Sequence, residues 1–142
     1  MIEQDKTTVY NNAQAVPLPG NTRAYLPAGA HLLADLHGVQ AVLLADGRQL
    51  ERVLKEAALA AGATILSSHF HRFGTGQGVT GVVLLAESHI SIHTWPEAGF
   101  AAVDLFMCGS AQVHEALALI SRALACAHCK STSVQRGSLP RP

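Results

Sequence analysis

The stretch GVTGVVLLAESHISIHTWPEAGFAAVDLFMC, residues 78–108, contains three consecutive apolar or β-branched runs with short breaks between them. The runs cover residues 79–86, 88–95 and 100–108. This composition is typical of β-strands, and strands that follow one another through short breaks usually pair antiparallel. The stretch therefore predicts the centre of an antiparallel sheet.

Further strands are expected on both sides of this stretch. Residues 31–37 alternate between apolar and polar side chains with the two-residue period of a strand. Residues 63–73 form another run rich in strand-forming residues, and residues 131–137 form a last short one.

Two amphipathic helices are expected between the strands. Asp46 followed by Gln49 resembles a capping box, and the apolar residues after it recur at helical spacing over residues 47–61. Ser110 is expected to cap a second helix. The apolar face of that helix consists of Val113, Ala116, Leu117, Ile120 and Leu124. The expected fold class is therefore α+β, a two-layer sandwich of an antiparallel sheet with two main helices on one face.

The length of 142 residues corresponds to about one domain. Hydrophobic residues make up 49% of the chain and charged residues 14%, which suits a compact core. Residues 1–29 are polar and rich in Pro and Gly, so we expect a flexible N-terminal extension there. Residues 30–142 are expected to form the single domain.

The charge balance and the cysteine content limit the partners of this domain. Ten basic residues balance ten acidic ones, so no net field attracts nucleic acid or an anionic membrane. No apolar run approaches the ~18 residues of a membrane span, and the N-terminus lacks the pattern of a secretion signal. Three cysteines, an odd number, fit a reducing compartment. We expect a cytoplasmic protein without nucleic-acid or membrane partners.

Polar residues concentrate where the first two central runs meet. The peptide between Glu87 and Ser88 is expected in or beside a tight connection, where the sheet can hold backbone strain. Alternation places Ser88 and His93 on opposite faces of a strand, so a turn or bulge at Ser88 is needed to bring them together. These side chains have an alternative role, because Ser and His in half-buried strands often bind only to backbone. A serine hydrolase is disfavoured, since the G-x-S-x-G elbow is missing.

The string ESHISIHTWPE, followed by AAVDLFMCG, resembles the S-adenosylmethionine decarboxylases of the small prokaryotic class. The resemblance extends over about residues 31–137 and includes HLLADLHG, AGATILSSHFHRF and GVTGVVLLAESH. In that family the serine of the ESH motif attacks the preceding carbonyl, and elimination from the resulting ester leaves a pyruvoyl group. The resemblance thus implies self-cleavage between Glu87 and Ser88 into a β chain of residues 1–87 and an α chain of residues 88–142.

The resemblance also implies roles for residues in processing and catalysis. Ser88 becomes the pyruvoyl cofactor, which forms a Schiff base with the substrate, so pyridoxal phosphate is not needed. His93 is the proton acceptor in processing, and an imidazole titrates near neutral pH. Thr80 stands where relatives carry a serine that assists processing. Cys108 is the proton donor in decarboxylation, although a cysteine taken alone is more often a buried filler.

For the substrate, S-adenosylmethionine, the resemblance implies Phe73 against the adenine and Glu97 on the ribose hydroxyls. The loop GTGQG after Phe73 is about one residue longer than the family pattern. The alternatives are that Phe73 is an aromatic residue of the core and that Glu97 is a solvated acid. The resemblance further implies a homodimer of processed protomers.

Two other groups of residues invite a metal or redox interpretation. Cys126 and Cys129 form a lone C-x-x-C, expected at a helix end, without the second ligand pair of a zinc site. His69 and His71 alternate on one strand face and are expected to form hydrogen bonds only. We assign no metal.

Two competing functions remain open. A pyruvoyl-dependent arginine or ornithine decarboxylase would use the same Ser88, His93 and Cys108, but Glu97 argues against it because those substrates lack a ribose. An uncleaved regulatory homologue is the second alternative, and such homologues usually lose the serine or the cysteine.

Overall fold

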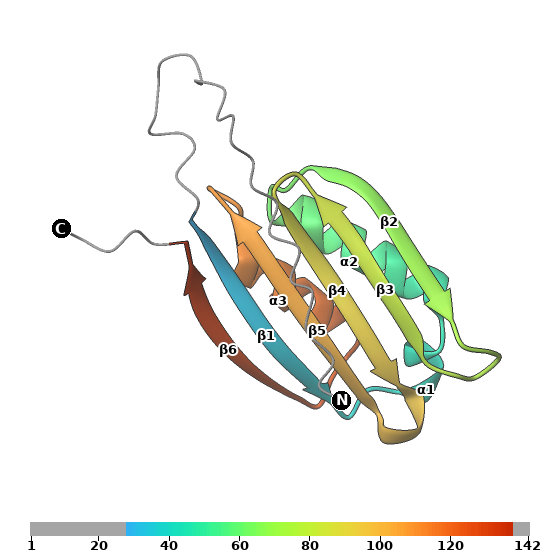
Figure 1. The fold of residues 1–142 in the computed structure, drawn as a ribbon. Helices are drawn as coiled ribbons and strands as arrows, with labels where there is room; N and C mark the ends of the chain where they lie inside the picture. The colour runs from blue at the N-terminus through green and yellow to red at the C-terminus, as the bar shows by residue number, and fades with distance from the viewer. Residues whose placement is uncertain (1–27, 138–142) are drawn as a thin grey trace, which may run out of the picture.

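A computed structural model describes residues 28–137, so the predicted flexible extension lies almost entirely outside the described residues. The elements are β1 (Gly29–His37), α1 (Ala41–Leu44), α2 (Gly47–Ala60), β2 (Ile65–Arg72), β3 (Val79–Leu85), β4 (Ser88–Trp95), the 3-10 helix η2 (Pro96–Ala98), β5 (Phe100–Cys108), α3 (Val113–Ala123) and β6 (His128–Arg136). The six strands form one antiparallel sheet in the order β2-β3-β4-β5-β1-β6, and α2 and α3 lie behind it (Figure 1). The predicted two-layer α+β fold is confirmed. We call the other face of the sheet, toward the viewer in Figure 1, the open face.

The predicted bounds of β4 and β5 are correct, two predictions about other elements fail, and one helix was not predicted. The short helix α1 was not expected. Ser110 does not cap α3, whose N-cap residue is Gln112 without a side-chain capping bond. The last strand begins at His128 instead of residue 131, because β6 pairs with β1 along its whole length.

The core lies between the sheet and the two long helices. The Asp46 carboxylate caps α2 by accepting a hydrogen bond of 3.1 Å from the backbone N–H of Gln49. Alternate residues of β1, β3, β4 and β5 point at the helices and are buried, and each large apolar side chain in the core contributes about 1.5–3 kcal/mol. The largest fully buried side chains of the strands, helices and connections are Leu32, Leu36, Leu44, Leu50, Leu54, Ile90, Ile92, Leu105, Ile120 and Leu124, followed by Val53 and Val79. The other residues of each strand therefore face the open side.

Thr94 is the one buried polar side chain among residues 28–137. Its hydroxyl donates to the carbonyl of Leu44 at 2.7 Å and accepts from the backbone N–H of Val79 at 2.8 Å. These bonds join α1, β3 and β4 at one end of the sheet. A buried hydroxyl with both a donor and an acceptor partner is fully compensated for its lost hydration.

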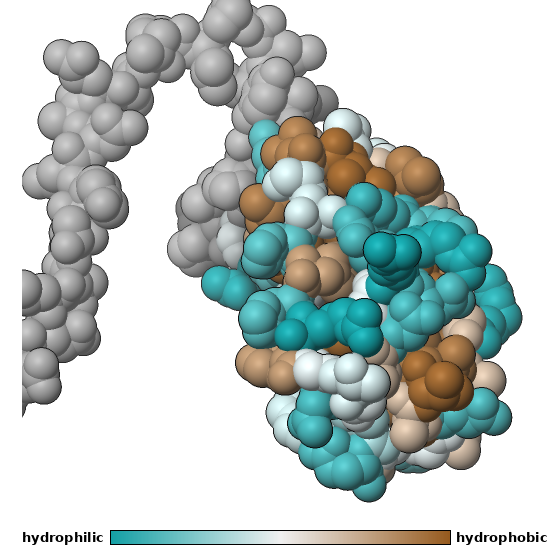
Figure 2. Space-filling view, turned by 90° about the vertical axis from the view of Figure 1, so that its right-hand side faces the viewer, coloured by the Kyte–Doolittle hydropathy of each residue, from teal (hydrophilic) through white to brown (hydrophobic). Residues whose placement is uncertain are grey.

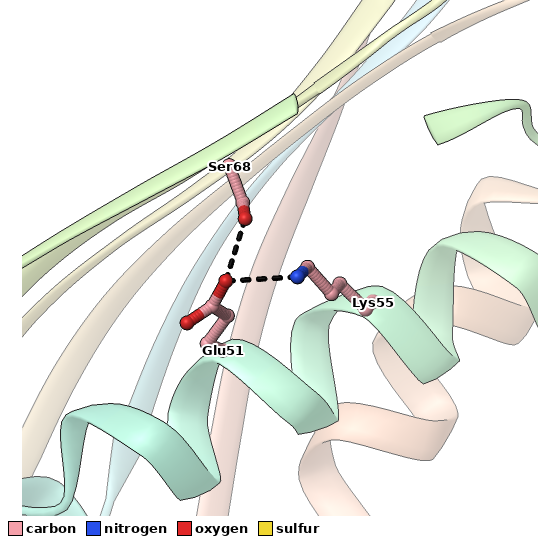
Figure 3. Close-up of polar contacts among 3 residues, drawn as sticks. All are labelled: Glu51, Lys55 and Ser68. Atoms are coloured by element: carbon pink, nitrogen blue, oxygen red, sulfur yellow. Dashed lines mark hydrogen bonds and ion pairs between the residues drawn. The ribbon is translucent and has the colours of Figure 1, made fainter. Parts of the chain in front are cut away.

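On the helix side, Glu51 of α2 links to the edge strand β2 (Figure 3). Its carboxylate accepts a hydrogen bond of 2.6 Å from the Ser68 hydroxyl and lies 2.8 Å from the Lys55 ammonium. The hydrogen bond from Lys55, followed by that from Ser68, lowers the pKa of the Glu51 carboxyl below its ordinary value.

Figure 2 views the molecule from the side on which β2 lies, and hydrophilic residues there separate smaller hydrophobic patches. None of the helices in residues 28–137 combines the length and the apolar character needed to span a bilayer.

Candidate active site

A tight turn joins β3 to β4 directly before Ser88. Leu85 pairs with Ser88, so only Ala86 and Glu87 lie in the turn. Glu87 has φ 62°, in the left-handed region, although it is not a glycine. That conformation costs a side-chain-bearing residue about 1–2 kcal/mol. The expected strained connection is therefore present, and the strain lies in the residue that precedes Ser88.

Ser88 and Cys108 lie together at this end of the sheet, where β4 begins and β5 ends. The backbone N–H of Cys108 donates to the Ser88 hydroxyl oxygen at 3.2 Å. Gly29 lies opposite Cys108 on β1, and a Cβ at Gly29 would be 3.0 Å from Cys108 Sγ and 2.8 Å from the Phe106 ring. The absence of a side chain at Gly29 thus allows β1 to pack closely against the thiol and the ring.

Aromatic and basic side chains line the open face next to this pair. The ring of Phe106 lies between two imidazoles, with centroid distances of 5.7 Å to His31 and 6.0 Å to His89. The Arg136 guanidinium lies 5.7 Å from the Phe106 ring centroid. Sequence reasoning did not single out these four residues, although alternation in β1 and β4 places both imidazoles on the open face. We call this region the Ser88 end of the sheet.

The remaining predicted site residues lie at the opposite end, which we call the His93 end. Thr80 and His93 are direct neighbours on β3 and β4, and Thr80 Oγ1 lies 3.0 Å from His93 Nδ1. Phe73 follows β2 with 64% of its surface exposed, so it is not a core residue. Its ring lies 4.8 Å from that of His71. Glu97 is exposed in the first turn of η2.

One chain does not bring the two ends together. The pairing of β4 with both neighbours is continuous from Ser88 or His89 to His93, so the bulge that would unite Ser88 with His93 is absent. At about 3.3 Å per residue, the two residues lie about 16 Å apart along the strand. A base must approach its proton to within about 3 Å, or through one water. Within one chain, therefore, Ser88 has Cys108 beside it but not Thr80, His93, Phe73 or Glu97.

The cysteine pair near the C-terminus differs from its predicted placement. Because α3 ends at Ala123, Cys126 lies in the connection and Cys129 on β6. Both are free thiols. Within residues 28–137, no group of three or more His, Cys, Asp or Glu side chains is arranged to hold a metal ion.

Comparison with known proteins defines the class first. The chain is 42% identical over 115 residues to the S-adenosylmethionine decarboxylase proenzyme of Caldicellulosiruptor saccharolyticus, covering 80% of this chain and 92% of that protein. It is 41% identical over 115 residues to the proenzyme of the same name from Acetivibrio thermocellus, with 80% and 92% covered. These similarities, with the α+β sandwich, place the chain in a class of decarboxylases made as proenzymes.

The family follows from a model and a crystal structure. The model described as S-adenosylmethionine decarboxylase matches residues 30–137. The crystal structure of the adenosylmethionine decarboxylase from Aquifex aeolicus VF5 superposes with a TM-score of 0.73 at 40% identity, covering 80% of this chain and 94% of that one. The chain belongs to the S-adenosylmethionine decarboxylase family, as its sequence motifs predict.

Proposed function

We propose that the chain cleaves itself between Glu87 and Ser88 and then decarboxylates S-adenosylmethionine to S-adenosylmethioninamine, the aminopropyl donor of spermidine and polyamine synthesis. The observation that carries this proposal is the strained Glu87, which directly precedes a serine hydroxyl held by the backbone of Cys108. A cytoplasmic location stays a prediction from the sequence.

The cleavage begins at the strained peptide. Ser88 Oγ attacks the Glu87 carbonyl carbon, the C–N bond breaks, and the chain continues through an ester. Loss of the Ser88 α-proton then breaks the Cβ–Oγ bond and releases the Glu87 carboxylate. Water hydrolyses the remaining C=N group, which releases the nitrogen as ammonia and leaves a pyruvoyl group. The strain is released when the peptide bond breaks, which favours the forward reaction.

The elimination step needs a base that removes the Ser88 α-proton, and we assign this role to His93. Its Nδ1 lies 3.0 Å from the Thr80 hydroxyl, which holds the ring in a fixed orientation. Since Thr80 retains the hydroxyl of the serine found in relatives, the same hydrogen bond is available. Both residues are supplied to Ser88 by a second copy of the chain, because their own strand holds them about 16 Å away.

The proposed active site is accordingly shared between two chains. In the proposed dimer the open faces of two protomers pack against each other, and the two-fold axis lies between them, perpendicular to the strands. This symmetry places the Ser88 end of each protomer over the His93 end of its partner. Apolar side chains exposed on the open face suit such a contact. They are Leu33, Leu84, Trp95 and Val134, each at least 40% exposed. We propose a homodimer of processed protomers with two such sites.

In each site the pyruvoyl group derived from Ser88 supplies the electron sink, by taking up the substrate amine and accepting the electrons left when carbon dioxide departs. Cys108, which packs against Gly29, returns a proton to the α-carbon. From the other chain, the Glu97 carboxylate accepts hydrogen bonds from the ribose hydroxyls. The exposed ring of Phe73, which packs edge-on against the His71 ring, lies against the adenine.

Intact mass measurement of the purified protein, before and after borohydride trapping, tests the activity. We expect two chains that split at Glu87, and a covalent adduct with S-adenosylmethionine. An adduct with arginine or ornithine instead would favour the alternative decarboxylases. A single full-length chain without a reactive keto group would favour the regulatory homologue and reject the proposal.

Mixing two inactive variants tests the shared site. Cys108→Ala removes the proton donor at the Ser88 end, and Glu97→Gln removes the carboxylate proposed to bind the ribose, so that the His93 end no longer holds the substrate. Each alone disables both sites of its dimer, whereas a mixed dimer retains one intact site, so random assortment restores about one quarter of wild-type activity. Mixing Cys108→Ala with Ser88→Ala is the control, because both changes affect the same end and no recovery is expected. Mixed dimers without activity would show that each chain builds its own site.

A further inference from the structure

The imidazole of His31 carries an unused hydrogen-bonding group beside the proposed reaction centre. Within residues 28–137, His31 Nε2 is buried and has no hydrogen-bond partner. Burying a polar nitrogen without a partner costs about 1–3 kcal/mol, so such a group in a folded protein calls for an explanation. His31 pairs with Phe106 on β5. This pair lies on the open face, two residues along the strands from the pair of Gly29 and Cys108.

The contact made by His31 Nδ1 indicates which ring nitrogen carries the proton. Arg136 Nη1 lies 3.5 Å from His31 Nδ1. Because a guanidinium can only donate, Nδ1 is the acceptor and carries no proton. The neutral ring then has its N–H at Nε2. The buried, partnerless atom is thus a donor, and its ligand must offer an acceptor.

We propose that His31 binds the α-carboxylate of the substrate, with Nε2–H donating to a carboxylate oxygen, and that Arg136 positions the imidazole for this contact. The proposal rests on the proposed function, which puts the amino-acid end of S-adenosylmethionine beside Ser88 and Cys108. His31 would recognise that end of any amino-acid substrate, whereas the His93 end reads the nucleoside.

A neutral donor suits a carboxylate that must leave. When the bond from Cα to the carboxylate breaks, the negative charge on the carboxylate disappears, and the pyruvoyl group would supply the electron sink for the bonding pair. A direct ion pair with Arg136 would stabilise the starting carboxylate more than the transition state and would slow the step. Arg136 instead bonds His31 and lies over Phe106. The Nε2 proton stays on His31 throughout.

Two substitutions separate the donor from the ring. His31→Phe keeps a planar ring and removes the donor, whereas His31→Gln offers an amide N–H near the position of Nε2. We expect His31→Phe to undergo cleavage and to raise KM for S-adenosylmethionine by about 10- to 100-fold, the range for a hydrogen bond to a charged group. His31→Gln should recover most of that loss. Inhibition by S-adenosylmethioninamine, which lacks the carboxylate, should be unchanged in both.

Two further variants complete the test. His37→Phe makes the same change on the same face of β1 at the other end, and should leave the ratio of substrate to product affinity at its wild-type value. Arg136→Met should raise KM for S-adenosylmethionine, again without effect on the product, because the ring loses its fixed tautomer.

The outcomes distinguish this inference from the proposed function. Equal loss of substrate and product affinity in His31→Phe would reduce His31 to a packing residue and overturn the inference. Cleavage blocked in both His31 variants, or a dimer that dissociates in both, would overturn it as well, by assigning Nε2 to processing or to the partner chain. A wild-type protein that is neither cleaved nor active would instead reject the proposed function itself.

Discussion

The Ser88 end and the His93 end of β4 differ in how the fold holds their polar side chains. At the Ser88 end, Glu87 is strained and His31 has an unpartnered nitrogen. At the His93 end, Thr94 satisfies buried backbone groups and Thr80 bonds His93. The proposed nucleophile thus lies where the fold is locally unfavourable, and the proposed base lies where the polar groups have hydrogen-bond partners. Stored strain and unpaired groups persist only when the surrounding sheet determines them.

The largest expected effect comes from Ser88→Ala, which removes the nucleophile. No cleavage and no decarboxylation should be detectable, by denaturing gel and by release of carbon dioxide. Ser91→Ala, on the same strand, is the matched control and should be cleaved like wild type. Cleavage of the Ser88 variant would show that the bond breaks elsewhere.

A second prediction concerns the strain at Glu87. Glu87→Gly fits a φ of 62° without the side-chain cost of about 1–2 kcal/mol, so self-cleavage should slow by about 5- to 30-fold. The rate is measured from freshly translated precursor. Glu87→Gln retains the strain and should be cleaved at nearly the wild-type rate.

Ala125→Gly provides a control in another region. Ala125 also has a positive φ, 46°, in the connection after α3. Relief there should leave the cleavage rate unchanged. Equal slowing by both glycine variants would mean that general flexibility, not strain at the scissile bond, sets the rate.

A third prediction concerns the stability contributed by Thr94 at the His93 end. Thr94→Val leaves the N–H of Val79 and the carbonyl of Leu44 without their partner, which should lower the free energy of unfolding by about 1–3 kcal/mol. Chemical denaturation of the Ser88→Ala precursor background measures this without interference from cleavage. Thr132→Val, on the exposed strand β6, should change it by less than about 0.5 kcal/mol. Equal effects of the two substitutions would contradict the role assigned to Thr94.

The smallest effect is expected at Glu51, away from both ends. Its pKa is lowered in the folded state, so its contribution is present above the unfolded pKa and is lost as pH falls through the folded pKa. Glu51→Gln should therefore reduce stability by less than about 1 kcal/mol near neutral pH and by less in acid. Urea titrations at neutral and at acidic pH measure the free energy of unfolding of both proteins. A difference between them that does not change with pH would refute the ionic contribution.

Local patterns predicted much of the fold and of the residue set. Alternation within residues 88–95 correctly separated Ser88 from His93, and the helical spacing of apolar residues correctly placed both long helices on one face. The capping role of Ser110 failed because helix ends depend on where the chain meets the sheet. The start of β6 failed because its length follows from pairing with β1. His31 and Arg136 were not predicted as site residues, since neither belongs to a recognisable motif.

The sequence by itself determined most of the strands and the face to which their side chains point, and it led to the proposal of Ser88 as the cleavage site, because these depend on residue periods and local motifs. Only the tertiary structure decided which residues meet. Insertion of β1 between β5 and β6 brings Gly29, His31 and Arg136 to the Ser88 end, while the unbroken β4 keeps His93 away. Pairing between strands distant in the chain arises from the packing of the whole sheet, so short-range patterns do not encode it.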